Sequence, residues 1–168
     1  SVSGSGNVAQ YAVEKAMALG AKVVTVSDSS GTVYDKDGFT TEKLATLMDI
    51  KNHKYGRVND YAALVGAEFM PGKTPWHIAV DIALPCATQN ELSAADAAML
   101  IKNGVVCVAE GANMPATIEA AKAFEAAGVL YAPGKASNAG GVATSGLEMS
   151  QNAARLSWPV EEVDARLL

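Results

Sequence analysis

The chain begins with a glycine-containing turn of a kind that can hold phosphate groups. Gly4, Gly6 and Ala9 have the spacing Gly-x-Gly-x-x-Ala, between a short apolar segment and an alanine-rich stretch. The first glycine permits a tight turn, the second lets the backbone approach a pyrophosphate, and the alanine lets the next helix pack close to the strand. The N-terminus of that helix offers unpaired N–H groups to an anion. Taken alone, this spacing is equally compatible with an ordinary tight turn.

The segment that follows this turn strengthens its interpretation as a phosphate-binding turn. We expect a helix over residues 7–19 that ends at Gly20, then a strand over residues 21–27, with Asp28 at its end. An acidic residue at this position commonly holds a ribose hydroxyl group of a dinucleotide. The order of turn, helix, strand and acid therefore predicts dinucleotide binding. Four residues of the turn are the expected cofactor contacts: Ser5, Gly6, Asn7 and Val8.

The residues around Asp28 bear on which nicotinamide cofactor is bound. Asp28 by itself predicts NAD, because a carboxylate binds a 2′-hydroxyl and repels a 2′-phosphate. The hydroxyl groups of Ser29 and Ser30 can instead donate to a phosphate. Lys51 lies on the apolar face of a helix that Thr40 or Thr41 caps, where a lysine either extends to solvent, complements the helix dipole or binds a ligand. We predict NADP, with NAD as the alternative.

Amide and hydroxyl side chains follow three further predicted strands, over residues 80–85, 105–109 and 129–132. Ligands bind beyond the carboxyl ends of the strands in open α/β sheets, and amide side chains suit the carboxamide of a nicotinamide. The alternative is that each residue only caps a helix or forms an Asx-turn. The candidate ligand contacts are Ala87, Thr88, Gln89, Asn90, Gly111, Ala112, Asn113 and Asn138.

The remaining elements alternate in a way that predicts a parallel sheet. Ser93 and Asp96 form a capping box for a helix that stops near Gly104. Pro115 suits the first turn of the next helix, and a glycine-rich loop over residues 139–141 leads into a long helix towards Leu156. We predict an α/β, Rossmann-like, doubly wound and mostly parallel sheet with helices on both faces. Residues 1–168 form one dinucleotide-binding domain with a truncated first strand, expected to be a fragment without its N-terminal substrate domain.

The amino-acid composition excludes several classes of function. The chain has 168 residues, 49% of them hydrophobic and 18% charged, and a net charge of −5. This balance offers no basic patch for nucleic acid, and no apolar run is long enough for a membrane helix. Cys86 and Cys107 read as buried reduced thiols, which indicates a cytoplasmic protein. His53 and His77 stand apart, so we expect no metal site.

Four runs resemble the cofactor domain of glutamate dehydrogenase, most closely the hexameric NADP-linked type of bacteria. They are SGSGNVA at 3–9, PCATQN at 85–90, AEGANMP at 109–115 and NAGGV at 138–142. The resemblance implies reversible oxidative deamination of L-glutamate to 2-oxoglutarate and ammonia, in a full-length homo-oligomer. It places Asn90, Asn113 and Asn138 around the nicotinamide and its ribose.

The resemblance also assigns the two ends of the ligand site. It implies that Ser29 and Lys51 contact the 2′-phosphate, and that Val142 and Ser145 reach the substrate. We expect Ser145 to open a helix whose N-terminus favours a carboxylate. The catalytic lysine and aspartate of the family belong to a separate N-terminal domain, so no catalytic residue is assigned here.

Two other functions remain open from the sequence. A leucine, phenylalanine or valine dehydrogenase would share the cofactor fold. A free-standing nucleotide-binding module would bind the cofactor without turnover. Oxidation of glutamate by the intact protein discriminates among the three.

Overall fold

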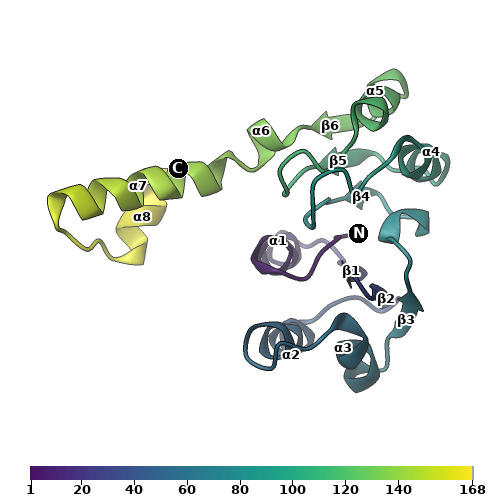
Figure 1. Ribbon diagram of the computed structural model, residues 1–168, viewed down its shortest axis with the longest axis horizontal. Helices are drawn as coiled ribbons and strands as arrows, with labels where there is room; N and C mark the ends of the chain where they lie inside the picture. The colour runs from purple at the N-terminus through teal and green to yellow at the C-terminus, as the bar shows by residue number, and fades with distance from the viewer. Residues whose placement is uncertain (168) are drawn as a thin grey trace.

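The computed structural model describes residues 1–167, and Figure 1 shows their arrangement. Helices and strands alternate along most of the chain, as the sequence predicts. The elements are α1 (Asn7–Ala18), β1 (Thr25–Asp28), β2 (Gly31–Tyr34), α2 (Thr41–Asn52), α3 (Val58–Val65), β3 (Glu68–Pro71), the 3-10 helix η1 (Pro75–His77), β4 (Ile82–Ala83), α4 (Ala94–Lys102), β5 (Cys107–Ala109), α5 (Ile118–Ala126), β6 (Leu130–Ala132), α6 (Gly134–Ser137), α7 (Ala139–Ala154) and α8 (Val160–Leu167).

The strands form two three-stranded groups that the N-terminal segment links. Strands β4, β5 and β6 are parallel, whereas β1, β2 and β3 are antiparallel. Between the groups, the Ser3 amide donates to the Leu84 carbonyl at 3.1 Å, and the Ser27 amide donates to the Gly4 carbonyl at 3.0 Å. Val2 pairs with Leu84 in a parallel bridge. The N-terminal segment therefore runs through the middle of the strands, beside the carboxyl ends of β1 and β4.

The prediction of a mostly parallel sheet missed strands β2 and β3. The α/β class is confirmed, but β1 turns back through Ser29 and Ser30 into the antiparallel strand β2. Gly31 begins β2 with a φ of +148°, and a Cβ there would collide with the Met70 carbonyl of β3. Short strands in a tight hairpin carry little periodicity, so their pairing is visible only in three dimensions.

Most helix ends are confirmed, and two are corrected. Thr40 caps α2 through the Lys43 amide, and Ser93 and Asp96 form the predicted capping box of α4. Pro115 does not lie in the first turn of α5, because Thr117 caps that helix. The glycine-rich residues 139–141 are not a loop, because they form the first turn of α7. Glycine and proline alone do not fix a boundary when a hydrogen-bonding cap lies nearby.

Two hydrophobic clusters support these elements. The first joins α1, α2 and α3 to β1 and β2, and the buried Ala9 confirms that α1 packs closely against the N-terminal segment. The second joins α4 and α5 to β4 and β5 through Trp76, Leu100 and Phe124. Both clusters lie below the carboxyl edge of the strands, and this arrangement leaves the loops at that edge free to form a site.

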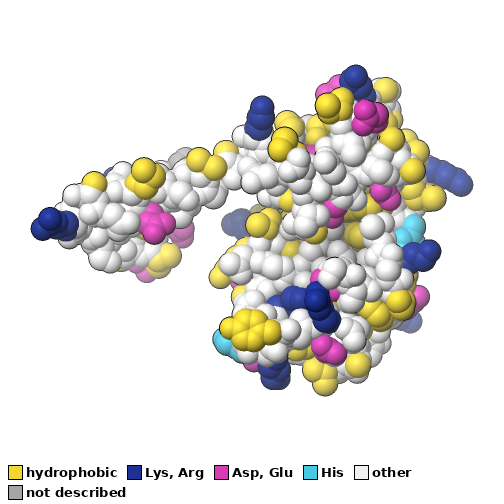
Figure 2. All heavy atoms as spheres, viewed as in Figure 1, with side chains coloured by type: hydrophobic (Ala, Val, Ile, Leu, Met, Phe, Trp, Pro, Cys, Tyr) yellow, Lys and Arg dark blue, Asp and Glu magenta, His cyan; other side chains and the backbone are white. Residues whose placement is uncertain are grey.

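Helices α7 and α8 project away from these two clusters, as Figure 1 shows in yellow-green. Neither helix contains a buried residue. The Trp158 amide donates to Gln151, and the Arg166 guanidinium lies 4.1 Å from the Trp158 ring centroid. These contacts fold α8 back on α7. Figure 2 shows hydrophobic side chains on this projecting arm, which include the exposed Val142, Met149, Leu156 and Val160.

Within residues 1–167, none of the helices combines the length and apolar character that a membrane crossing requires. Cys86 is buried, as predicted, whereas Cys107 is only half-buried, and neither takes part in a disulfide in the structure. His53 and His77 are exposed at the surface, as expected.

Candidate functional site: a pocket at the carboxyl edge of the strands

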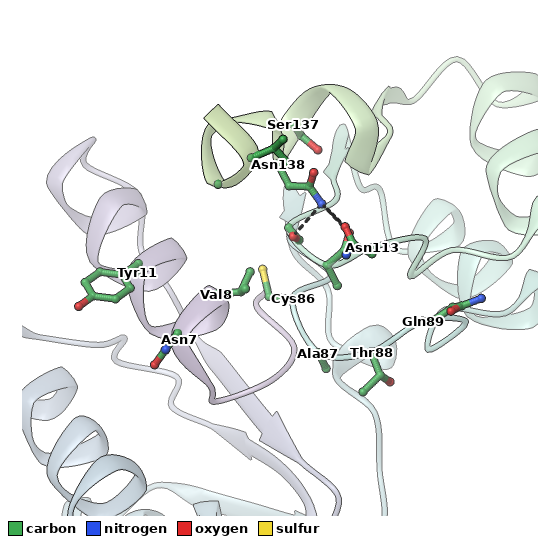
Figure 3. Close-up of a pocket in the computed structure, with 14 residues that line it drawn as sticks. Asn7, Val8, Tyr11, Cys86, Ala87, Thr88, Gln89, Asn113, Ser137 and Asn138 are labelled. Atoms are coloured by element: carbon green, nitrogen blue, oxygen red, sulfur yellow. Dashed lines mark hydrogen bonds between the residues drawn. The ribbon is translucent and has the colours of Figure 1, made fainter. Parts of the chain in front are cut away.

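A pocket of about 790 Å³ lies where the loops after the N-terminal segment, β4, β5 and β6 meet the base of α7. Figure 3 shows these segments facing one another across it. The carboxyl ends of parallel strands meet at one edge, which explains why loops distant in sequence converge. The lining residues are Asn7, Val8, Tyr11, Cys86, Ala87, Thr88, Gln89, Gly111, Ala112, Asn113, Ser137, Asn138, Gly141 and Val142.

The first wall is the glycine turn and the start of α1. Gly4 has a φ of +83°, and a Cβ there would lie 2.8 Å from the Cys86 carbonyl, so the predicted tight turn is present. Gly6 is the N-cap of α1, and an added Cβ would meet none of the described heavy atoms within 4 Å. A glycine N-cap supplies no side-chain acceptor for the first amides of the helix. This open helix start suits an anion such as a pyrophosphate.

The second wall is the loop after β4, which a carboxylate holds in shape. Glu91 accepts hydrogen bonds from the amides of Ala87 at 2.8 Å and Thr88 at 3.3 Å. Burial raises the pKa of the Glu91 carboxyl above its ordinary value, although these bonds oppose the rise. Burial also raises the pKa of the Cys86 thiol to about 12, with the nearby Glu91 charge adding to the effect. Cys86 therefore lines the pocket as a neutral thiol, not as a nucleophile.

The third wall brings together two of the three predicted asparagines. The Asn138 side-chain amide donates to the Asn113 Oδ1 at 2.9 Å and to the Ala112 carbonyl at 3.2 Å. Asn90 is not part of the lining: its backbone amide donates to the Met114 carbonyl at 3.0 Å, and its φ is +56°. The structure therefore brings Asn113 and Asn138 together but leaves Asn90 outside the lining, and its place beside the nicotinamide or its ribose stays a prediction.

The fourth wall is the first turn of α7. Val142 lines the pocket, as expected from the resemblance. Ser145 does not open this helix, because α7 begins at Ala139 and Ser145 lies in its second turn. The prediction that Ser145 opens the helix is therefore wrong, and its contact with the substrate stays a prediction. Residues three apart share a helix face, so Ser145 follows Val142 on the same face, one turn further from the base.

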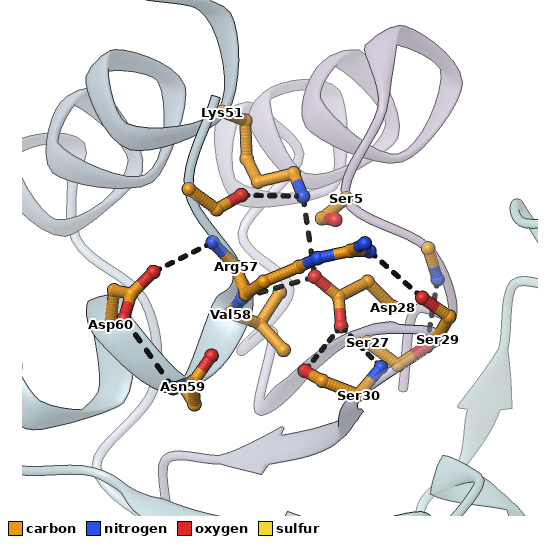
Figure 4. A network of polar contacts seen from close by, with 12 residues as sticks. Ser5, Ser27, Asp28, Ser29, Ser30, Lys51, Arg57, Val58, Asn59 and Asp60 are labelled. Atoms are coloured by element: carbon orange, nitrogen blue, oxygen red, sulfur yellow. Dashed lines mark hydrogen bonds and ion pairs between the residues drawn. The ribbon is translucent and has the colours of Figure 1, made fainter. Parts of the chain in front are cut away.

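A separate polar network surrounds Asp28 (Figure 4). One carboxylate oxygen accepts from the amide and hydroxyl of Ser30, and the other accepts from Lys51 at 3.2 Å and the Val58 amide at 3.1 Å. Partial burial favours the neutral acid, but these hydrogen bonds outweigh it and hold the pKa of Asp28 below its ordinary value. Asp28 is thus engaged by four protein donors, so its carboxylate serves to hold Lys51 and the start of α3.

Arg57 is a member of this network that the sequence reasoning missed. Its guanidinium donates to the Ser29 hydroxyl at 2.8 Å, and its backbone amide donates to Asp60 at 2.8 Å. The Arg57 guanidinium therefore holds Ser29 near the ion pair of Asp28 with Lys51. The available signal was a second cation six residues after Lys51. Two cations and a hydroxyl group form a suitable arrangement for a phosphate monoester.

Most of the predicted site residues thus fall into two places, and Gly6, Asn90 and Ser145 belong to neither set. Ten of them line the pocket: Asn7, Val8, Ala87, Thr88, Gln89, Gly111, Ala112, Asn113, Asn138 and Val142. Asp28, Ser29 and Lys51 lie in the polar network, with the turn residue Ser5 shown beside it in Figure 4. The pocket also contains Tyr11, Cys86, Ser137 and Gly141, which were not predicted. Tyr11 could have been found, because it follows Val8 by one helical turn.

The lining contains no Asp, Glu, His or Lys among the described residues. General acid–base catalysis needs a titratable group within hydrogen-bonding reach of the reacting atoms. The pocket can therefore bind and orient a ligand with amide, hydroxyl and backbone groups. Besides these groups, the lining carries the Tyr11 hydroxyl and the neutral Cys86 thiol.

Parallel strands with a pocket at their carboxyl edge, a glycine turn and an uncapped helix start define a Rossmann-like α/β fold. The profile of the Glutamate/Leucine/Phenylalanine/Valine dehydrogenase family matches residues 1–168, and the chain belongs to that family.

Curated relatives agree with this assignment. The chain is 71% identical over 167 residues to the NADP-specific glutamate dehydrogenase of Haemophilus influenzae and 68% identical over 167 residues to that of Escherichia coli. Both matches cover 99% of this chain and 37% of the relative, so the chain spans about a third of their length. The solved glutamate dehydrogenase of Plasmodium falciparum superimposes with a TM-score of 0.94 at 49% identity, over 99% of this chain and 36% of that protein.

Proposed function

We propose that this chain is the cofactor-binding domain of an NADP-dependent glutamate dehydrogenase. The full-length protein would interconvert L-glutamate, NADP⁺ and water with 2-oxoglutarate, ammonia and NADPH. The observation that carries the proposal is the convergence of four strand-end segments on one amide-lined pocket, in a chain about 70% identical to NADP-specific glutamate dehydrogenases.

The residues present fit a dinucleotide along this edge. Gly6 leaves open space at the start of α1, where the helix dipole favours a pyrophosphate. The amides of Asn113 and Asn138 suit the nicotinamide carboxamide. When bound, the cofactor supplies hydride acceptance and donation, while this chain binds and orients it and excludes water from one side of the cleft.

Ser29, Lys51 and Arg57 support the choice of NADP over NAD. The Arg57 guanidinium is bonded to the Ser29 hydroxyl, and the Lys51 ammonium is bonded to the carboxylate of the neighbouring Asp28. The Lys51 and Arg57 cations would therefore attract a 2′-phosphate, while the repulsion from Asp28 is reduced because its carboxylate is paired with Lys51. We propose that these residues hold the adenosine end, and that the pocket holds the nicotinamide end.

Val142 and Ser145 are the proposed substrate contacts of this domain. Val142 lines the pocket, and Ser145 shares its helix face. In the full-length protein, the Ser145→Ala change would remove a hydroxyl hydrogen bond to the substrate carboxylate. The catalytic lysine and aspartate are proposed to lie in the rest of the protein.

The same proposal includes a cytoplasmic homohexamer. Two free thiols support a reducing compartment. The exposed apolar side chains of α7 and α8 support packing against other parts of the assembly. Light scattering on the full-length protein measures its subunit number.

The decisive experiment assays the purified full-length protein for reduction of NADP with glutamate, and with leucine, phenylalanine and valine as competing substrates. Glutamate-dependent reduction is expected to dominate. The Gly6→Val variant should remain folded, because its side chain would point into open space. It should lose cofactor affinity, because the valine would occupy the space proposed for the pyrophosphate. Faster reduction with leucine, phenylalanine or valine would assign another amino-acid dehydrogenase, and binding without turnover would indicate a nucleotide-binding module.

A further inference from the structure

Glu110 is a buried carboxylate at the end of β5 that faces only hydrogen-bond donors among its described contacts. Its exposed fraction is 3%. The side chain accepts from the Ala116 amide at 3.2 Å, the Tyr131 hydroxyl at 2.6 Å and the Gly134 amide at 2.7 Å. None of the ion pairs found within residues 1–167 includes Glu110. A buried carboxylate is costly unless its oxygens are bonded, and these three donors supply that compensation.

The three donors come from three separate segments. Ala116 ends the loop after β5, Tyr131 lies in β6, and Gly134 is the first residue of α6. Ser137, in the same short helix, donates its hydroxyl to the Glu110 carbonyl. Glu110 therefore ties the loop after β5 to the segment from β6 to the base of α7.

The two asparagines of the pocket lie directly beyond these ties. A Cβ on Gly134 would lie 2.8 Å from the Ala112 carbonyl and 3.3 Å from the Asn138 side-chain nitrogen. That nitrogen bonds the Ala112 carbonyl and the Asn113 side chain. If Gly134 moved away from Glu110, the side chains of Asn138 and Asn113 would therefore move as well.

We propose that Glu110 is a positioning residue for the nicotinamide end of the cofactor site. Its carboxylate holds Gly134 and Ala116 in place, and through them orients Asn138 and Asn113 in the pocket. The inference rests on the proposed function, because it takes the pocket to be the nicotinamide end.

The chemistry of the three partners explains why a carboxylate is needed. Backbone amides only donate, and burial together with the Glu110 hydrogen bond raises the pKa of Tyr131, so its hydroxyl keeps its proton as a donor. A glutamine has nearly the same shape but offers one acceptor oxygen and an NH₂ group. In either orientation, that NH₂ group would face the amide of Gly134 or of Ala116, donor against donor.

The test uses the full-length protein with the Glu110→Gln variant. Losing a hydrogen bond to a charged group predicts a fall in kcat and in NADP affinity of about tenfold or more. The affinity for 2′,5′-ADP, which carries only the adenosine end, should stay within about twofold, because the Asp28 network shares no contact with Glu110. Calorimetric titration measures both affinities without turnover. Glu119→Gln, which neutralises an exposed carboxylate on α5, is the matched control and should change neither.

A second variant keeps the inference testable if Glu110→Gln does not fold. Tyr131→Phe removes one donor but retains the ring, which stacks on Phe124 at 5.8 Å between centroids. It should also lower NADP affinity, but to a smaller extent than Glu110→Gln. Combined with Asn138→Ala, the Glu110→Gln change should add little further loss, because both act on one network.

Three outcomes would overturn the inference. The first is unchanged kcat and NADP affinity in Glu110→Gln. The second is an equal loss of NADP and 2′,5′-ADP affinity, which would mean that Glu110 stabilises the whole domain. The third applies if Glu110→Gln does not fold: it is an unchanged NADP affinity in Tyr131→Phe. Failure of the proposed function is distinct, because it would show as absent glutamate-dependent turnover in the unmodified protein.

Discussion

The hydrogen-bond partners of Asp28 change the role that its carboxylate can play. A carboxylate at the end of this strand would favour a ribose hydroxyl if it were free. Here its two oxygens accept four hydrogen bonds from Ser30, Lys51 and the Val58 amide. Its negative charge is therefore directed at Lys51, and the side chains left to meet a ligand phosphate carry hydroxyl and cationic groups.

The Lys51→Glu change should shift cofactor preference from NADP towards NAD in the full-length protein. It replaces a cation with a carboxylate beside Asp28, which would repel a 2′-phosphate. The measurement is the ratio of kcat/KM for NADP to that for NAD. Lys54→Glu is the matched control, because Lys54 is exposed, pairs with Asp49 at 2.6 Å and lies outside the network. An unchanged ratio in Lys51→Glu would remove Lys51 from the phosphate site.

The Asp28→Asn change should destabilise the protein by about 1–3 kcal/mol at neutral pH, because donors lose a charged acceptor. The folded pKa of Asp28 lies below the ordinary value of 3.8, so its stabilisation is present above that pH. It is lost as the pH falls through the folded value. Urea unfolding of both proteins across the acid range should therefore show a stability difference that shrinks below pH 3.8. A difference that stays constant through this range would contradict the assignment.

At the scale of elements, the antiparallel hairpin supports the polar network. Strands β1 and β2 join through Ser29 and Ser30, so the hairpin turn itself presents the Ser29 hydroxyl to Arg57. The position of β2 depends on Gly31, whose backbone no other residue adopts easily. The turn that carries Ser29 is thus coupled to the packing of β2 against β3.

The Gly31→Ala change should destabilise the domain by about 2 kcal/mol or more, because a Cβ at a φ of +148° would collide with the Met70 carbonyl. Denaturant unfolding measures the effect. Gly140→Ala is a matched control: this glycine lies in α7, where a Cβ meets none of the described atoms within 4 Å. Since alanine is the better helix former, the control should be neutral or stabilise by about 0.5–1 kcal/mol. Equal stabilities of both variants would show that the hairpin tolerates a side chain.

At the scale of the whole molecule, four segments of the described residues converge on one pocket. The pocket is lined by amide, hydroxyl, thiol and apolar side chains, and the α7–α8 arm projects beyond it with exposed apolar residues. Hydride transfer requires the substrate carbon to be held against the nicotinamide in a site closed to water. The arrangement therefore fits binding of the cofactor better than complete catalysis.

We expect the isolated 168-residue chain to bind NADP weakly and to show no glutamate-dependent reduction of it. The physical reason is the lack of Asp, Glu, His and Lys side chains among the described residues that line the pocket. Assaying the chain beside the full-length protein, at equal concentration, checks this expectation. Turnover by the isolated chain would mean that a catalytic group lies on this domain, with Lys135 the first residue to examine.

The sequence by itself determined the α/β class, the cap at Ser93, a cap at Thr40 or Thr41, and the residues that follow each parallel strand. These features are local: a cap needs an acceptor a few residues from its donor, and a strand end is marked by the change from apolar to polar residues. The family resemblance added the likeness to glutamate dehydrogenases, which the relatives then bore out.

Only the tertiary structure decided how those residues combine. Asn90 turns to the Met114 carbonyl while Asn113 and Asn138 bond each other, although all three follow strand ends. Arg57 joins Ser29, and Glu110 joins Gly134, across separations of more than twenty residues. Such contacts depend on the packing of distant elements, whereas sequence patterns report the periodicity and capping of each element alone. That is the physical reason why the strand-end residues were predictable and their hydrogen-bond partners were not.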